Sequence, residues 1–164
     1  MTNADNSGEV RLEIRIEASP KTVFALLTDP EQLKSWIADL VVAEPKPGGQ
    51  FRASGPLGTI EGAYVEVIPD TKVVFTWGGV GGVAPGQSTV EFTLEADRNT
   101  TIVRLRHYGL PRPTVEEHHR LWLHAGLVKI KDSAEGRRPT ATCMNDAAAH
   151  ASSATSENGS ANGK

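Results

Sequence analysis

Apolar and polar residues alternate strictly near the start of the chain, over residues 10–18. Leu12, Ile14 and Ile16 fall on one side, and charged residues occupy the positions between them. Successive side chains of a β-strand point to opposite faces of the sheet. The pattern therefore predicts a strand with one buried face.

After this strand, the apolar residues recur at helical spacing instead of at every second position. Ser19 is a favourable N-cap, and Pro20 suits the first turn of a helix, which we expect over residues 20–29. Pro30 interrupts the pattern, because proline disfavours helical backbone in the residue before it. A second short helix is predicted over residues 30–39, which makes a helix, a break and a helix.

A run of antiparallel strands follows, separated by turns rich in glycine, proline and aspartate. The predicted strands cover residues 40–44, 50–54, 59–68, 72–77, 88–96 and 100–108. The glycine-rich loop 78–86 lacks the Gly-Lys-Ser/Thr ending of a phosphate loop and opens no helix, so we do not expect nucleotide binding there.

The last predicted element is a long helix over residues 114–136. Thr114 and Glu117 have the spacing of a capping box, and apolar residues recur behind them at helical intervals. Strands segregated from helices indicate an α+β fold. We predict a curved antiparallel β-sheet wrapped around the long C-terminal α-helix, with the two short helices after the first strand closing one end.

Composition narrows the functional classes. The 164 residues suit one domain, and a net charge of −3 without a Lys/Arg cluster argues against nucleic-acid binding. No stretch approaches the roughly 20 apolar residues that span a bilayer. The N-terminal residues are polar and lack a signal-peptide core, so we expect a cytoplasmic protein. The single cysteine, Cys143, excludes an internal disulfide and a cysteine-based zinc site.

The aromatic residues end at Trp122, and the last part of the chain is rich in Ala, Ser, Asn and Gly. Such a segment buries too little apolar surface to offset its ordering entropy. We therefore predict a flexible N-terminus over residues 1–8, a single domain over 9–136 and a disordered tail over 137–164.

The segment EEHHRLW, residues 116–122, brings together side chains that can bind metals or transfer protons. His118 and His119 are neighbours on a helix and point about 100° apart, which does not suit a chelate, and we expect no metal site. His107 lies on the apolar face of its predicted strand, and we expect its side chain to contact His118 of the long helix in the interior. Two interpretations are open: both histidines carry protons in an enzyme, or both are polar groups hydrogen-bonded to Tyr64 or to the backbone. We favour the second, because no Ser-His-acid or Cys-His arrangement and no cofactor motif is evident.

Several large aromatic residues share inward phases on the predicted strands and helices. Pockets for small molecules are mostly apolar with a few polar groups, although each aromatic residue taken alone is better explained as part of the core. The predicted ligand-binding set is Trp36, Phe51, Tyr64, Phe75, Trp77, Phe92, His107, His118 and Trp122.

Six stretches, taken in order, resemble one superfamily. They are IEASPKTVFALLTDPEQLKSWIAD (16–39), PGGQFR (47–52), GAYVEVIPDTKVVFTW (62–77), STVEFTLE (88–95), TTIVRLRHYGLP (100–111) and HHRLW (118–122). Together they resemble the START-like, or SRPBCC, superfamily, in the group named for the C-terminal domain of the activator of Hsp90 ATPase. The resemblance implies a helix-grip fold with a pocket between sheet and helix that takes an apolar or amphipathic small molecule. This chain departs from the pattern at Leu121, where the family commonly has glycine, and at Gly126 and Lys129, where leucines are common.

Fold alone does not decide function in this superfamily. The favoured hypothesis is binding of an apolar or aromatic small molecule without catalysis and without a cofactor. One alternative is an enzyme of the cyclase, dehydratase or hydrolase type that uses His107 and His118. Another is a module that interacts with a chaperone, and a homodimer is a further expected partner arrangement.

Overall fold

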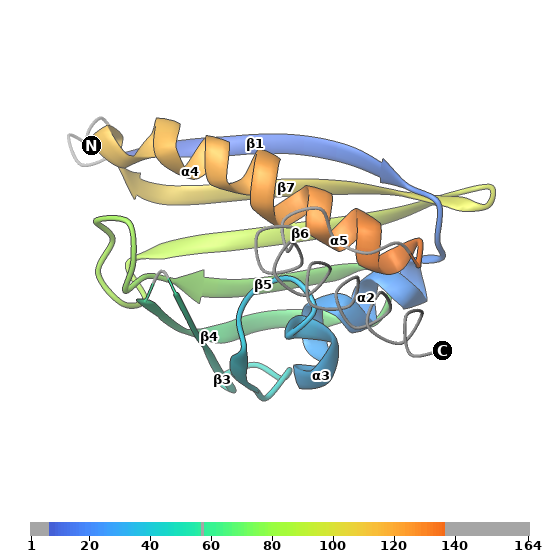
Figure 1. Cartoon of the computed structure of the whole chain (residues 1–164), viewed down its shortest axis with the longest axis horizontal. Helices are drawn as coiled ribbons and strands as arrows, with labels where there is room; N and C mark the ends of the chain where they lie inside the picture. Colours follow the sequence, from blue (N-terminus) through green and yellow to red (C-terminus); the bar gives the residue numbers. More distant parts are fainter. Residues whose placement is uncertain (1–6, 57, 137–164) are drawn as a thin grey trace, which may run out of the picture.

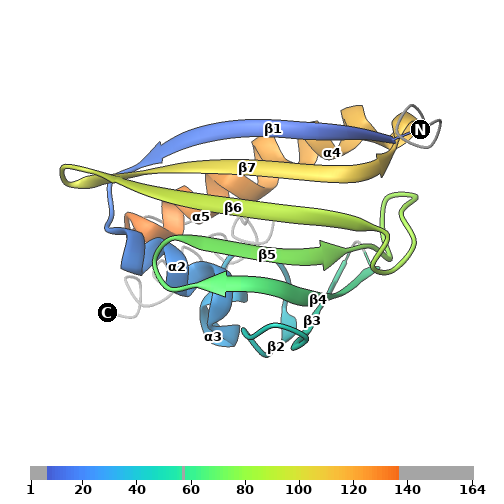
Figure 2. The same ribbon diagram turned by 180° about the vertical axis from the view of Figure 1, so that it is seen from behind.

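Seven strands form one antiparallel sheet in the computed structural model, which describes residues 7–56 and 58–136. The strand order is β1-β7-β6-β5-β4-β3-β2, which Figure 2 shows from the outer face for most of the sheet. The strands are β1 (Ser7–Ile16), β2 (Leu40–Ala43), β3 (Gln50–Gly55), β4 (Gly58–Ile68), β5 (Lys72–Trp77), β6 (Ser88–Asp97) and β7 (Thr100–Pro111).

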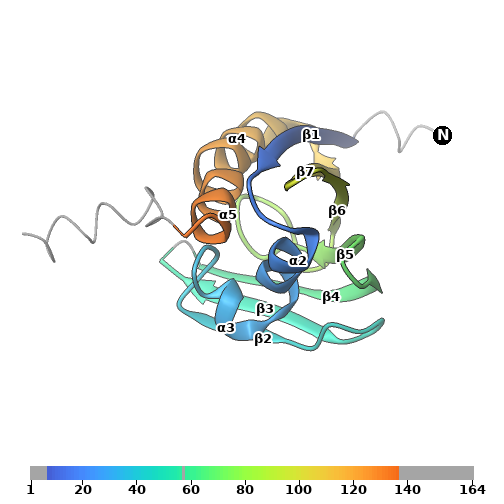
Figure 3. The same ribbon diagram turned by 90° about the vertical axis from the view of Figure 1, so that its right-hand side faces the viewer.

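The sheet curves around a helix that crosses its concave face (Figures 1 and 3). This helix is built from η1 (Arg112–Thr114), α4 (Val115–Leu121), the π-helical turn η2 (Trp122–Gly126) and α5 (Leu127–Ala134). The predicted α+β architecture is confirmed. The predicted flexible residues 1–6 and the tail 137–164 lie outside the described residues, whereas Ser7 and Gly8 belong to β1 and pair with β7.

Two short helices follow β1 and close one end of the interior (Figure 3). In α2 (Pro20–Thr28) the Ser19 hydroxyl accepts a hydrogen bond from the Thr22 N–H at 3.2 Å, as expected of an N-cap. The second helix, α3 (Pro30–Leu33), ends six residues earlier than predicted. Trp36 lies in the turns that follow, where its indole N–H donates to the Leu26 carbonyl at 2.7 Å.

The long helix does not start as the sequence predicts. The Thr114 hydroxyl donates to the Pro111 carbonyl at 2.7 Å, and Thr114 makes no side-chain cap to α4, so the predicted capping box is wrong. The reason is the preceding 3₁₀ turn η1, which places Thr114 itself in helical conformation (φ −96°, ψ −4°) instead of the extended conformation typical of a cap.

Inward-facing positions of the strands form the core, and outward-facing positions of β1, β6 and β7 carry mostly charged residues. The strict alternation within residues 10–16 is confirmed, because Ile16 is buried in the core and Leu12 and Ile14 are partly buried against it. Within residues 7–56 and 58–136, no helix is long and apolar enough to cross a membrane.

Candidate functional site

A small cavity lies between the long helix, the sheet and the turns after α3. Its volume is about 100 Å³. The lining consists of apolar groups and one lysine: Trp36, Ile37, Ile60, Trp77, Leu121, Trp122, Ala125, Gly126 and Lys129. An apolar space with few polar groups is the usual form of a small-molecule site, although most such sites are larger.

The helix side of the cavity is formed by the π-helical turn η2, which ends at Gly126. A Cβ atom at Gly126 would lie 2.5 Å from Cε3 of Trp122, so the Trp122 ring rests directly against the helix backbone. Turns of π-helix occur frequently at functional sites, because they reorient side chains within a continuous helix. Any side chain at position 126 would displace this ring.

Three of the predicted ligand-binding residues, Trp36, Trp77 and Trp122, line the cavity. Ring centroids of Trp122 and Trp77 are 5.3 Å apart, and those of Trp122 and Trp36 are 6.2 Å apart. Together the three indoles form an aromatic wall.

The other predicted aromatic residues pack against one another and are not among those that line this cavity. They are Phe51, Tyr64, Phe75 and Phe92, with ring centroids separated by 4.2 Å for Phe51–Phe75 and 5.6 Å for Phe51–Tyr64. The Tyr64 hydroxyl donates to the Leu27 carbonyl at 3.0 Å, and burial raises the pKa of Tyr64. These four side chains occupy the core.

His107 is the centre of a buried hydrogen-bond chain. The Trp122 indole N–H donates to Nδ1 of His107 at 2.9 Å, and Nε2 of His107 is 2.8 Å from the Ser88 hydroxyl. An indole nitrogen can only donate, so Nδ1 must be the acceptor and the proton of the neutral ring is on Nε2. Nε2 therefore donates to Ser88, whose own hydroxyl donates to the Trp77 carbonyl at 2.9 Å.

This arrangement holds His107 neutral. Burial, and to a smaller extent the nearby His118, lowers the pKa of His107 to about 3. With its proton on Nε2, the ring cannot accept the hydroxyl proton of Ser88, so the Ser88–His107 contact is not an activated nucleophile. His107 serves here as a structural link between β6, β7 and the helix.

His118 lies beside His107, as the sequence predicted. The ring centroids are 5.3 Å apart and the rings are nearly perpendicular. Nδ1 of His118 donates to the Thr114 carbonyl at 2.8 Å, so its main partner is backbone of its own helix. The glycine-rich loop covers the ring, because a Cβ at Gly81 would lie 2.9 Å from Cε1 of His118.

A family model described as "Activator of Hsp90 ATPase homolog 1-like protein" matches residues 17–133. The chain belongs to this family. The match covers most of the sheet, both short helices and nearly all of the long helix. A comparison of the AHSA1-family chain with curated proteins gave no match.

Solved structures agree with this assignment. An AHSA1-like protein of Rhizobium etli is 33% identical, with 81% of this chain and 85% of that protein covered and a TM-score of 0.63. The Aha1 protein of Colwellia psychrerythraea, described as a dimer in solution, is 23% identical, covers 78% of this chain and 96% of its own, and gives a TM-score of 0.68. A Chromobacterium violaceum protein with 22% identity covers 80% and 98%, with a TM-score of 0.67.

Sequence reasoning missed several residues of this candidate site. Ser88 was not recognised as a partner of His107, although both occupy inward positions on adjacent strands. Gly126, Lys129 and Leu121 stood out only as departures from the family pattern, and all three line the cavity. A departure from a family pattern at a pocket wall is therefore the signal that could have found them.

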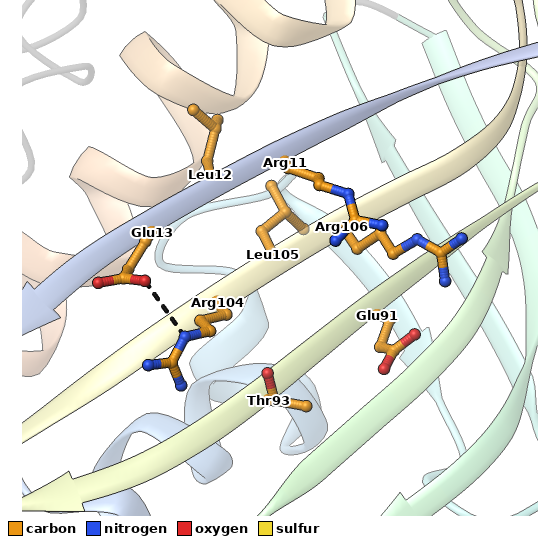
Figure 4. A pocket seen from close by; sticks show the side chains of 8 residues that line it. All are labelled: Arg11, Leu12, Glu13, Glu91, Thr93, Arg104, Leu105 and Arg106. Atoms are coloured by element: carbon orange, nitrogen blue, oxygen red, sulfur yellow. Dashed lines mark hydrogen bonds and ion pairs between the residues drawn. The ribbon is translucent and has the colours of Figure 1, made fainter.

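A second hollow, of about 380 Å³, lies on the outer face of the sheet (Figure 4). Its arginines are all paired with carboxylates: Arg104 with Glu13 at 3.2 Å, and Arg11 and Arg106 with Glu9. Leu12 and Leu105 contribute to its lining, but its charged side chains are engaged in ion pairs on the open face of the sheet, so this hollow is a weaker candidate than the interior cavity. Within the described part of the chain, no three His, Cys, Asp or Glu side chains are grouped to hold a metal ion.

The Ser88→Ala variant tests the hydrogen-bond chain. It leaves the His107 N–H and the Trp77 carbonyl without their partner, and we expect the free energy of unfolding to fall by about 1–2 kcal/mol. Urea unfolding measures this change. Thr89→Ala, at the neighbouring position on the opposite face of β6, is the control. A loss no larger than that of the control would contradict the assigned chain.

Proposed function

We propose that the protein binds a small apolar or aromatic molecule in the cavity walled by Trp36, Trp77 and Trp122. The observation that carries the proposal is an apolar space at the junction of sheet and helix, lined by three tryptophans and by Gly126, which lets the Trp122 ring lie against the helix backbone. An aromatic ligand gains from offset and edge-to-face contacts with such a wall, in addition to the apolar area that it buries.

Cavity volume limits what fits. A cavity of about 150 Å³ is known to accept benzene, so the 100 Å³ found here takes no more than one ring, which would extend into the mouth of the cavity. A larger ligand would leave part of its structure in the mouth of the cavity. The proposal therefore concerns recognition of one compact aromatic or apolar group.

Benzyl alcohol, a neutral single-ring compound, is a suitable probe in an NMR titration. Ala125→Leu adds volume at the cavity wall, and we expect at least a tenfold loss of affinity, or about 1.4 kcal/mol. His124→Leu is the matched control, because His124 is the preceding residue of the same helix and is exposed. The proposal fails if millimolar benzyl alcohol shifts no resonance of the tryptophan wall, or if both variants bind it equally well.

A further inference from the structure

One charged side chain, Lys129, belongs to the wall of the otherwise apolar cavity. It is partly buried, and among the described residues it forms no ion pair. Burial lowers the pKa of Lys129, while the negative charge of Asp39 opposes this effect. An ammonium group that has lost part of its hydration without gaining a close counter-ion is stabilised when an anion binds beside it.

Trp77, which also lines the cavity, has a polar atom without a partner. Nε1 of Trp77 is buried, and it is the one buried side-chain nitrogen or oxygen of the described residues that makes no hydrogen bond. The other two indoles of the wall are satisfied, since Trp36 donates to Leu26 and Trp122 donates to His107. A buried donor without an acceptor costs about 1–3 kcal/mol, and a ligand that shifts the Trp77 ring enough to expose Nε1 to one of its oxygens would remove that cost.

We propose that the ligand of this cavity is a small aryl or arylalkyl carboxylate. Its ring packs against the tryptophan wall, its carboxylate pairs with the Lys129 ammonium, and one of its oxygens accepts a hydrogen bond from Nε1–H of Trp77. This inference rests on the proposed function, since it names the chemical class that the same cavity takes.

Two simpler roles of Lys129 have to be compared with this one. Lysine side chains often lay their methylene groups over apolar surface and keep the ammonium in water. Asp39 could also act as the counter-ion, but it is exposed and forms no ion pair with Lys129. Neither role supplies an acceptor for Trp77, whereas a carboxylate ligand serves both groups at once.

The test compares phenylacetate with its uncharged analogue phenylacetamide in NMR titrations of the full chain. We expect phenylacetate to bind at least tenfold more tightly. Lys129→Met should reduce its affinity to that of the amide, whereas Lys21→Met, which removes the same charge from exposed α2, should not. Of the three indole N–H signals, the one assigned to Trp77 by Trp77→Phe should move most, because it gains an acceptor.

The outcomes separate this inference from the proposed function. Equal affinities for acid and amide, or an unchanged affinity in Lys129→Met, overturn the carboxylate assignment while the cavity remains a site for neutral rings. Binding that moves neither the Trp77 indole signal nor the other two overturns it as well. If benzyl alcohol, phenylacetate and phenylacetamide all fail to bind, both proposals fall.

Discussion

Acidification from pH 7 to pH 4.5 is expected to lower the free energy of unfolding by about 2.5 kcal/mol through His107 alone. The pKa of a histidine in the unfolded chain is near 6.5, and burial lowers it to about 3 in the folded protein. Between these values the unfolded state binds the proton and the folded state does not. The stabilisation is therefore complete above pH 6.5 and is lost as the pH falls toward 3.

Urea unfolding of the wild type and of His107→Gln at both pH values measures this effect. Glutamine does not titrate, and it retains an amide donor and a carbonyl acceptor for Ser88 and Trp122. Between pH 7 and pH 4.5 the variant should lose about 2.5 kcal/mol less free energy of unfolding than the wild type. The contributions of all other titrating groups are the same in both proteins and cancel in the comparison. Parallel pH profiles of the two proteins would show that His107 is not held neutral.

Gly126→Leu is expected to destabilise this chain by about 3 kcal/mol. Leucine is a better helix former than glycine by roughly 1 kcal/mol, and this gain would prevail in an open environment. Here the new Cβ would lie 2.5 Å from the Trp122 ring. That ring cannot move freely, because it is hydrogen-bonded to His107 and packed against Trp77 at 5.3 Å.

A double-mutant cycle decides whether the ring is the cause. In a Trp122→Phe background the smaller ring lacks the atoms that clash, and the penalty of Gly126→Leu should fall by more than half. Thermal or urea unfolding of the four proteins gives the coupling energy. Additive effects would mean that the cost arises elsewhere in the helix.

Much of the fold could be predicted because strands repeat every two residues. The alternation assigned an inward face to β1, β5, β6 and β7, and it placed His107 opposite His118 without knowledge of the turns. Helix ends were predicted less well, since α3 stops at Leu33 and Thr114 does not cap α4. Local signals compete there with tertiary contacts, which the sequence pattern does not contain.

The candidate site was less predictable for a geometric reason. Phe75 and Trp77 share an inward phase on β5, yet one belongs to the packed core and the other to the cavity wall. Periodicity tells which face a residue occupies, not whether its neighbours fill the space beside it. The chain Trp122–His107–Ser88 likewise joins a helix to two strands, and no spacing along the sequence encodes it.

The position of β1 affects the order in which the protein can assemble. Strands β2 to β7 pair largely with their neighbours along the chain, but β1 pairs with β7, and the contact of Arg15 with Thr100 joins positions 85 residues apart. During synthesis the first strand must wait without its partner until nearly the whole sheet has emerged. Such distant pairings slow folding and leave an unpaired strand exposed to association in the meantime.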